Sequence, residues 1–266
     1  MQDTGKFRSN DKDKFYTKPS IAVSCVAELT KHAVGTWIEP SAGSGAFVDA
    51  VKHDVVAMDI EPGRDGIVKQ DFLTWTSPYT NCTVFGNPPF GRQATLARKF
   101  IKYASTFADV IGFILPRSFM KPSMQRAFPL EFHLVHESPI EKDSFLVNDK
   151  PYDVPCVFQI WKRMKTPRSI AVAEETEWIY VKKNEPHDIA IRRVGVYAGK
   201  CMLPDDSLSV QSHYFIKLPD GNDVSAIVDY VCKNEFPSNT TGPRSLSKPE
   251  VNSVLGECVV TTRELQ

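Results

Sequence analysis

The chain has 266 residues, and its 32 lysines and arginines are balanced by 32 aspartates and glutamates, so the formal net charge is zero. A composition that is 42% hydrophobic and 24% charged is typical of a folded globular protein and excludes a disordered chain. The length suits one large domain, or a core domain of about 170 residues with a small addition. The charge balance argues against a protein that coats a polyanion nonspecifically.

Membrane and export signals are not evident in the sequence. No apolar run approaches the roughly 20 residues that a membrane-spanning helix needs, and the opening segment lacks the apolar stretch of a signal peptide. The six cysteines are widely spaced without a C-x-x-C pair, which argues against a zinc ribbon or a disulfide framework. We therefore expect reduced thiols and an intracellular protein, cytoplasmic or nuclear, that does not associate with a membrane.

Short apolar runs alternate with helical patterns in the first part of the chain, as is typical of β-α-β units and a mostly parallel sheet. The predicted fold class is therefore α/β. Helices are predicted over residues 21–31, 46–52 and 95–105, and strands over residues 36–39, 55–59, 82–86, 110–115, 132–136 and 154–161.

The alternating pattern ends at residues 163–169 (RMKTPRS), which carry charge and a proline. We predict a mobile arm at 1–14, a main domain at 15–165 and a small C-terminal α+β region at 166–266 that helps to select the substrate. In this region the sequence predicts strands at 178–181, 189–196 and 213–218 and a helix at 224–233, followed by a tail rich in Ser, Thr, Pro and Gly.

The most informative segment is a glycine-rich turn, WIEPSAGSGAF at residues 37–47. Gly43 and Gly45 permit positive φ and let a ligand approach the backbone, although a lone G-x-G turn is also common for purely structural reasons. The next predicted strand ends in Asp59, about twenty residues after Glu39, where nucleotide-binding sheets place a carboxylate that accepts hydrogen bonds from ribose hydroxyls. This order favours a nucleotide-type ligand.

Two later segments offer groups that complement an adenine. In QDFL at residues 70–73, Asp71 and Phe72 pair a carboxylate with an aromatic face, although Asp71 could equally cap a loop. In GNPPFG at residues 86–91, two prolines remove N–H donors and leave carbonyl oxygens as acceptors. Asn87 adds a side-chain oxygen there. A planar amino group, with two N–H donors, is the complement of this arrangement.

Together and in this order, EPSAGSG at 39–45, Asp59, QDFL at 70–73 and NPPF at 87–90 resemble the S-adenosylmethionine-dependent amino-methyltransferases, specifically the N6-adenine branch. FYTKP at 15–19 resembles that family's N-terminal cofactor motif, and the motif order is the one called gamma in DNA methyltransferases. The resemblance covers residues 15–161 and implies a Rossmann-like class I methyltransferase fold. The stretch between Gly45 and Asp59 is shorter than the family pattern, which limits its helix to about two turns.

The resemblance implies that S-adenosylmethionine is the cofactor. Tyr16 and Thr17 would hold its methionine part and Glu39 its ammonium group. The glycine turn would face its carboxylate and ribose, with Asp59 at the ribose hydroxyls. The expected cofactor-binding residues are Tyr16, Thr17, Glu39, Pro40, Ser41, Gly43, Gly45, Asp59, Asp71 and Phe72.

Asn87, Pro88, Pro89 and Phe90 are the predicted catalytic residues. The amino nitrogen of adenine is a poor nucleophile because its lone pair is delocalised into the ring. Hydrogen bonds from its N–H groups to the Asn87 side-chain oxygen and the Pro88 carbonyl would favour a more tetrahedral nitrogen, and would stabilise the charge that develops as the methyl group arrives. No strong general base is needed before the transfer.

The predicted partner is DNA or RNA, in which the target adenine is flipped out or single-stranded, because a base inside a duplex cannot reach such a pocket. Phe90 would form one stacking face. For the other we predict Phe145, in the expected loop at 138–153, with Tyr152 as the alternative. A competing interpretation makes Phe145 an anchor packed on the core.

Seven basic residues and a single acidic one lie between residues 92 and 126, directly after the NPPF segment. We predict phosphate contacts from Arg92, Arg117 and Lys121, although a solvated helix face would also explain such a run. Arg192 and Arg193 are predicted to contact nucleic acid from the C-terminal region, where basic and aromatic residues mix.

Other functions are also compatible with the NPPF motif. NPPF also occurs in enzymes that methylate guanine N2 in RNA, and a close relative of these modifies a glutamine side-chain amide in release factors. A third alternative is a catalytically silent subunit that only binds nucleic acid. We predict no metal site, because His133 and His136 would point to opposite faces of a strand.

Overall fold

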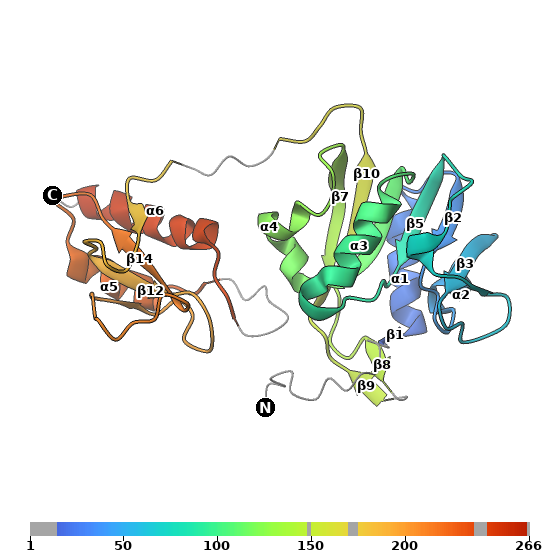
Figure 1. Cartoon of the computed structure of the whole chain (residues 1–266), viewed down its shortest axis with the longest axis horizontal. Coiled ribbons are helices and arrows are strands. Elements are labelled where there is room, and N and C mark those ends of the chain that lie inside the picture. The colour runs from blue at the N-terminus through green and yellow to red at the C-terminus, as the bar shows by residue number, and fades with distance from the viewer. Residues whose placement is uncertain (1–14, 148–149, 170–174, 237–243, 265–266) are drawn as a thin grey trace. The chain divides into compact units, whose positions relative to one another are not determined.

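The computed structural model describes residues 15–147, 150–169, 175–236 and 244–264. The chain forms two compact units, Met1–Ile170 and Ala171–Gln266. The division falls directly after residues 163–169, where the alternating pattern of the sequence ends. Figure 1 shows that each unit is built around its own sheet. The expected arm at 1–14 lies outside the described residues.

The first unit contains the elements of the predicted α/β pattern, several with the predicted limits. In chain order its elements are β1 (Tyr16–Thr17), α1 (Pro19–Thr30), β2 (Thr36–Glu39), α2 (Ala46–Ala50), β3 (Val55–Asp59), β4 (Val68–Lys69), the 3₁₀ turn η1 (Phe72–Thr74), β5 (Cys82–Gly86), η2 (Arg92–Ala94), α3 (Thr95–Ala104), β6 (Val110–Pro116), η3 (Arg117–Met120), α4 (Pro122–Gln125), β7 (Phe132–Pro139), β8 (Phe145–Val147), β9 (Lys150–Tyr152) and β10 (Cys156–Arg163). The short α2 agrees with the short stretch that the sequence leaves between Gly45 and Asp59.

The main sheet of this unit has seven strands in the order β4-β3-β2-β5-β6-β10-β7. Adjacent strands from β4 to β6 are parallel, whereas β10 runs antiparallel to both of its neighbours. This confirms the predicted fold class, a Rossmann-like α/β fold with a mostly parallel sheet. Because parallel strands end at the same sheet edge, β2, β3 and β5 bring the segments that follow Glu39, Asp59 and Gly86 together.

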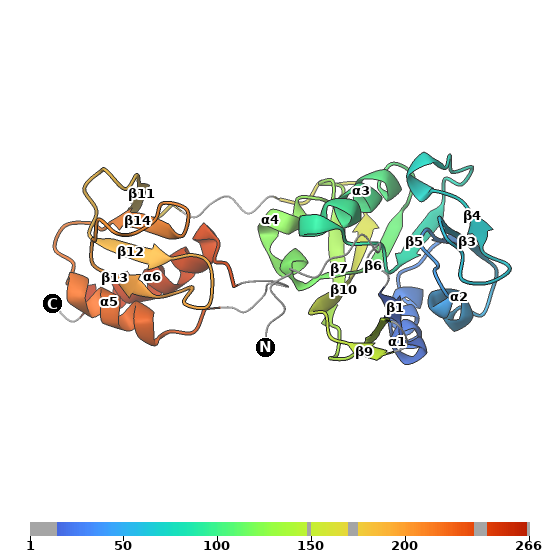
Figure 2. The ribbon, with the colours of Figure 1, turned by 60° about the horizontal axis from the view of Figure 1, so that its bottom comes forward.

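Helices cover both faces of this sheet. Figure 2 shows α3 and α4 on one side of it and α1 and α2 on the other. The central strands β5 and β6 are buried along their whole length, as expected for strands covered on both faces. Toward the β7 edge, the rings of Phe128 and Trp161 stack with their centroids 4.2 Å apart. The sheet is therefore packed on both faces, and its strand ends carry the loops that form the site.

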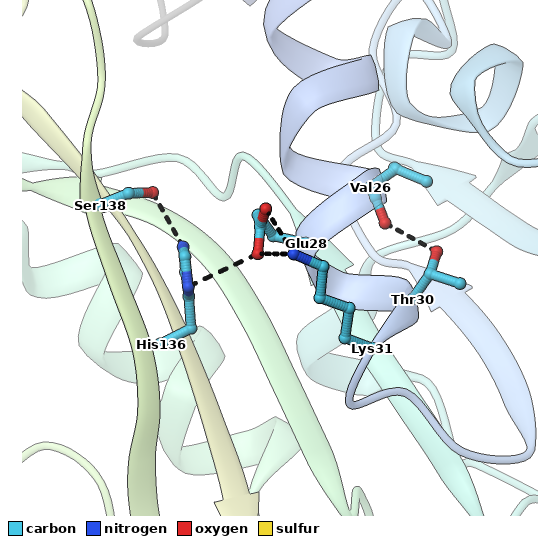
Figure 3. Close-up of polar contacts among 6 residues, drawn as sticks. All are labelled: Val26, Glu28, Thr30, Lys31, His136 and Ser138. Carbon is cyan, nitrogen blue, oxygen red and sulfur yellow. Dashed lines mark hydrogen bonds and ion pairs between the residues drawn. The ribbon is translucent and has the colours of Figure 1, made fainter.

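A polar contact joins α1 to β7 (Figure 3). The Glu28 carboxylate lies between the Lys31 ammonium group, 2.8 Å away, and Nδ1 of His136, 3.8 Å away. The His136 Nε2 contacts the Ser138 hydroxyl at 3.0 Å. The hydrogen bond from Lys31 lowers the pKa of Glu28. Since these groups lie near the surface, the contact contributes little to stability.

Residues 138–153 do not form the simple loop that we expected. They include the end of β7 and the hairpin β8–β9, and β8 also pairs with β1, giving a small sheet of order β1-β8-β9. The register places Thr17 opposite Phe145. The N-terminal strand is thereby held beside the main sheet.

The second unit is a small α+β structure, as predicted. It contains β11 (Ile179–Val181), β12 (Ile189–Arg192), β13 (Cys201–Met202), β14 (His213–Lys217), α5 (Val224–Lys233) and α6 (Lys248–Glu264). The antiparallel sheet has the order β11-β14-β12-β13. The helix α6 was not predicted, because we expected an irregular tail there. None of the helices in the described part of the chain has the length and apolar character needed to cross a lipid bilayer.

Candidate active site

A cavity of about 340 Å³ opens where β2, β3 and β5 end. The segments after these strands form much of its wall, and β1 and α3 close it from the sides. Most of the lining residues come from the motifs of the sequence: Phe15, Tyr16, Thr17, Glu39, Pro40, Ser41, Ala42, Gly43, Ser44, Ala46, Phe47, Asp59, Ile60, Glu61, Asp71, Phe72, Leu73, Asn87, Pro88, Pro89, Phe90, Leu96 and Phe100.

The Asp59 carboxylate ties the glycine turn to the loop after β3. One of its oxygens accepts the Gly43 N–H at 2.8 Å, and the other accepts the Glu61 N–H at 2.7 Å. The Gly63 N–H in turn donates to the Gly43 carbonyl at 2.8 Å. These bonds fix Asp59 at the cavity wall, and the remaining lone pairs of its oxygens can accept hydrogen bonds from hydroxyl groups.

Gly45 begins α2 in the left-handed region, with φ of 90°. A Cβ atom at this position would lie 2.5 Å from the guanidinium carbon of Arg64. Arg64 packs over the turn and forms a bidentate ion pair with Asp49. Its two terminal nitrogens lie 2.8 and 2.7 Å from the two carboxylate oxygens. Gly45 is the one expected cofactor residue that does not line the cavity. Its role here is to let Arg64 pack against the turn, a role that the sequence analysis missed.

Glu39 is a carboxyl group that is 2% exposed at the end of β2. Burial, together with the nearby negative charge of Asp59, raises its pKa to about 8. Its Oε2 atom is buried and has no hydrogen-bond partner among the described residues. Gly86 makes room for this side chain, since a Cβ there would lie 3.2 Å from Glu39 Cγ. The charged form of such a buried carboxyl group is stable only beside a cation, and Glu39 lines the cavity, where a cationic group of a ligand can reach it.

Asn87 has a fixed amide orientation. Its Nδ2 atom donates to the Phe15 carbonyl and to the Thr17 hydroxyl, both at 3.1 Å. Both acceptors belong to the N-terminal segment around β1. The opposite atom, Oδ1, is buried and has no hydrogen-bond partner within the described part of the chain. Both N–H groups are therefore occupied, and Oδ1 of this cavity-lining residue remains an acceptor for an N–H donor.

The rest of the NPPF segment is held by its neighbours. The Ser41 hydroxyl donates to the Asn87 carbonyl at 3.2 Å. The Phe90 carbonyl accepts the N–H groups of Leu96 and Ala97, at 3.1 and 3.3 Å. The prolines have no N–H of their own. The glycine turn and the start of α3 therefore fix the peptide that carries Asn87.

At the other end of the cavity, Asp71 and Phe72 lie side by side in the wall. The Asp71 carboxylate accepts the Leu73 N–H at 2.9 Å and caps the turn η1, so the loop-capping role is present. The Phe72 ring belongs to an aromatic cluster, with Phe100 at 5.2 Å and Tyr103 at 5.1 Å between ring centroids. This end of the cavity offers an apolar wall beside a carboxylate.

Of the fourteen residues expected to bind cofactor or to act in catalysis, thirteen line this one cavity, with Gly45 as the exception. Phe15, Leu96 and Phe100 also line it, although none of them was predicted as a site residue. Phe15 could have been found, because it begins the FYTKP segment. The other two lie on or near α3 and carry no local signal of a ligand.

The predicted stacking role of Phe145 is not supported. Its side chain is 1% exposed, belongs to the main hydrophobic core and, unlike Phe72, does not line the cavity, so it presents no face to a base there. The competing interpretation, an anchor packed on the core, describes its position. Tyr152 is 38% exposed and stacks on Phe15, with ring centroids 5.4 Å apart. Because Phe15 lines the cavity, Tyr152 is the better candidate for a stacking residue.

The predicted phosphate contacts of the first unit do not line the cavity. Arg92 is exposed and Arg117 is half-buried, so both stay predictions. Lys121 is only 8% exposed, and this burial argues against a phosphate contact.

In the second unit, Arg192 lines a separate cavity. The guanidinium group of Arg193 donates to the Gln211 carbonyl at 2.8 Å and lies 5.5 Å from the ring centroid of Tyr214. No group of three or more His, Cys, Asp or Glu within the described ranges could hold a metal ion.

No protein-family profile matches this chain, and no curated protein matches it. Among solved structures, a candidate RNA methyltransferase from Pyrococcus horikoshii is 16% identical with a TM-score of 0.45, covering 61% of this chain and 93% of that one. The 23S rRNA methyltransferase ErmE is 16% identical with a TM-score of 0.41, covering 57% of this chain and 71% of that one.

A type I restriction-modification methyltransferase subunit from Streptococcus thermophilus is 13% identical with a TM-score of 0.43. The match covers 93% of this chain and 57% of that one. At such identities and TM-scores these similarities assign no activity to this chain. Its chemistry has to be inferred from the residues of the cavity.

Proposed function

We propose that this chain is an S-adenosylmethionine-dependent methyltransferase that modifies the N6 amino group of an adenine in DNA or RNA. The observation that carries the proposal is the Asn87 side chain, whose amide nitrogen is held by Phe15 and Thr17 and whose buried oxygen has no partner among the described residues. A planar amino group supplies the N–H donor that this oxygen lacks. The intracellular location expected from the reduced thiols agrees with a nucleic-acid substrate.

The cavity residues fit the proposed cofactor. The ammonium group of S-adenosylmethionine would pair with Glu39, whose Oε2 atom is buried without a partner in the described chain. The ribose hydroxyls would donate to Asp59, which the glycine turn holds in place. The adenine would lie against Phe72, with Asp71 beside it. When bound, the cofactor supplies an electrophilic methyl group on a sulfonium.

Asn87 and Pro88 would activate the substrate amino group by accepting its two N–H donors. Acceptors in this position favour a tetrahedral nitrogen, whose lone pair can attack, and they stabilise the positive charge that develops on it. Both groups belong to a peptide fixed by Ser41 and α3, so little reorganisation is needed during the reaction. The proton that the nitrogen releases after methylation needs no strong base within the site.

The proposal is tested by transfer of a tritiated methyl group to matched DNA and RNA panels, followed by identification of the modified nucleoside. N6-methyladenine is the expected product. N2-methylguanine, or label in a protein glutamine, would overturn the adenine assignment. No detectable binding of S-adenosylmethionine in calorimetry would instead favour a catalytically silent subunit.

Asn87→Ala is the matched variant for this assay. It should bind S-adenosylmethionine in calorimetry and lose transfer by about 10²–10³-fold, the cost of removing one donor or acceptor that acts on the transition state. Asn81→Ala, at an exposed position just before β5, serves as the control and should keep full activity. Equal rates for wild type and Asn87→Ala would contradict the assigned role.

A further inference from the structure

The second unit contains a cavity of about 480 Å³ that the proposed reaction does not use. Its wall is formed by the end of β12, by the turn and strand that follow and by the loop before β14. Two cations, one histidine, three serines and one tyrosine line it, together with two apolar side chains: Arg192, Tyr197, Lys200, Met202, Ser207, Leu208, Ser209, Ser212 and His213. No carboxylate is among these lining residues, so the cavity favours an anion.

His213 is 6% exposed and lines this cavity. Its Nδ1 atom lies 3.1 Å from the Ser209 carbonyl and 3.0 Å from the Ser212 hydroxyl. Because a carbonyl only accepts, the contact with Ser209 places a proton on Nδ1. The Nε2 atom is buried and has no hydrogen-bond partner in the described part of the chain. A ligand in the cavity would supply one, an O–H or N–H group that donates to Nε2.

The two cations of the cavity carry charge that no described carboxylate balances. Neither Arg192 nor Lys200 forms an ion pair with a carboxylate of the described residues. The Nε of Arg192 donates to the Val194 carbonyl at 3.2 Å, which limits the movement of the guanidinium group. The cavity therefore combines a partly fixed guanidinium with an ammonium group on an exposed residue, a pairing suited to a phosphate.

Tyr197 adds an exposed aromatic ring to the same wall, with 68% of the residue accessible. It lies in the turn between β12 and β13, where the Lys200 N–H donates to the Tyr197 carbonyl at 3.1 Å. This bond keeps the ring and the ammonium group in one short turn. An exposed aromatic ring beside cations is the usual arrangement for binding a single-stranded nucleic acid, because bases stack on the ring while phosphates contact the cations.

We propose that this pocket binds a nucleotide unit of single-stranded nucleic acid. The phosphate would lie between Arg192 and Lys200, an O–H or N–H group of the nucleotide would donate to Nε2 of His213, and the base would stack on Tyr197. The inference deepens the proposed function, since it gives the second unit a direct part in holding the substrate strand.

The experiment measures binding and not methyl transfer. The full chain is titrated, without S-adenosylmethionine, into fluorescently labelled single-stranded DNA and RNA at several salt concentrations. Tyr197→Ala should weaken binding by about 5- to 100-fold, the range expected for one stacked base. Lys200→Gln should weaken binding and reduce the salt slope by about 0.7, the value for one phosphate contact on a single strand.

Both positions are exposed, so these variants should fold normally, and circular dichroism checks this. Lys233→Gln, an exposed position on α5 away from the cavity, is the matched control and should bind like wild type. His213→Gln should also weaken binding, because Nε2 is lost. Wild-type affinity in both Tyr197→Ala and Lys200→Gln would overturn the proposal.

Two competition experiments distinguish a nucleic-acid strand from a free mononucleotide or inorganic phosphate as the ligand. A free mononucleotide and inorganic phosphate should compete only at concentrations far above the affinity for the oligonucleotide. A mononucleotide that competes as well as the oligonucleotide would overturn the assignment to a polymer. If strand binding depends on Tyr197 and Lys200 while no substrate is methylated, the proposed function fails and this inference stands.

Discussion

The side-chain amide of Asn87 donates to the hydroxyl of Thr17 across 3.1 Å, although 70 residues separate the two positions. Thr17 lies in β1, and β1 is held by pairing with β8. The orientation of the predicted catalytic amide therefore depends on three segments that are distant in sequence. The second acceptor of the amide nitrogen, the Phe15 carbonyl, belongs to the same N-terminal segment.

Thr17→Val should slow methyl transfer without changing the fold. The valine has a similar shape but leaves one N–H of Asn87 without its acceptor, so the amide loses part of its fixed orientation. We expect kcat to fall about fivefold, equivalent to about 1 kcal/mol for one neutral hydrogen bond. Single-turnover rates, combined with the calorimetric Kd of S-adenosylmethionine, separate this effect from weaker cofactor binding.

Thr17→Ser is the control, because it keeps the hydroxyl and should restore most of the rate. If Thr17→Val reacts as fast as wild type, the hydrogen bond does not orient Asn87. If instead only the cofactor Kd changes, Thr17 acts on the methionine part alone, as the sequence resemblance first implied.

Phe145→Ala should behave as a core truncation. The side chain is 1% exposed and packs in the main hydrophobic cluster, so its loss should cost about 3–5 kcal/mol of unfolding free energy. Urea unfolding measures this cost. A variant that keeps wild-type stability but loses substrate affinity would restore the stacking role that the sequence first indicated.

Tyr152→Ala should give the opposite pattern. The residue is partly exposed and stacks on Phe15, which lines the cavity. We expect little change in stability and a substrate Kd raised by about 5- to 100-fold, as for the loss of one stacked base. Tyr152→Phe keeps the ring and should bind like wild type. Equal affinity of Tyr152→Ala and wild type would exclude it as a stacking residue.

Much of the fold and of the site could be predicted from sequence because the informative residues are local. Glu39, Asp59 and Asn87 each stand at or just after the end of an apolar strand, and parallel strands bring such ends to one edge. The position of Phe145 could not be predicted in this way. It depends on the pairing of β8 with β1, two segments that are distant in the sequence. Neither segment shows a hydrophobic periodicity that would predict this pairing.

The helix α6 was missed although a local signal for it exists. The Ser247 N–H and hydroxyl both donate to the Glu250 carboxylate at 2.7 Å, an interaction typical of a serine that precedes a helix with glutamate three residues later. The following sequence, rich in β-branched residues and with Gly256 in its middle, has low helix propensity. Packing against α5 outweighs that propensity.

Cys232 should be the one cysteine that reacts readily in the native protein. It is exposed, whereas the other five are buried. Burial raises the pKa of Cys25 to about 12 and that of Cys82 to about 11, so these thiols are neutral as well as inaccessible. Titration with a thiol-specific disulfide reagent at pH 8 should show a fast phase of about one equivalent, followed by slow reaction that tracks unfolding. Cys232→Ser should abolish the fast phase, and its persistence would contradict this assignment.

Glu39 should release a proton when the cofactor binds. Burial and the charge of Asp59 raise its pKa to about 8, so the carboxyl group of the free protein is mostly protonated at pH 7. The ammonium group of the cofactor is still mostly charged at that pH, and pairing with it requires the carboxylate. Calorimetry in buffers of different ionisation enthalpy should therefore show release of about one proton per cofactor. Glu39→Gln should release almost none and bind more weakly.

The same group should make the cofactor-free protein less stable as the pH rises. In the unfolded chain Glu39 titrates near its ordinary pKa of 4.5, whereas in the folded chain it keeps its proton up to about pH 8. Between these values the folded state binds more protons, so the unfolding free energy falls with rising pH, by on the order of a few kcal/mol. Glu39→Gln removes this dependence and should be more stable than wild type at pH 8, as urea unfolding at pH 5 and 8 can measure. If both proteins lose stability equally between these two pH values, Glu39 is not the group that holds the proton.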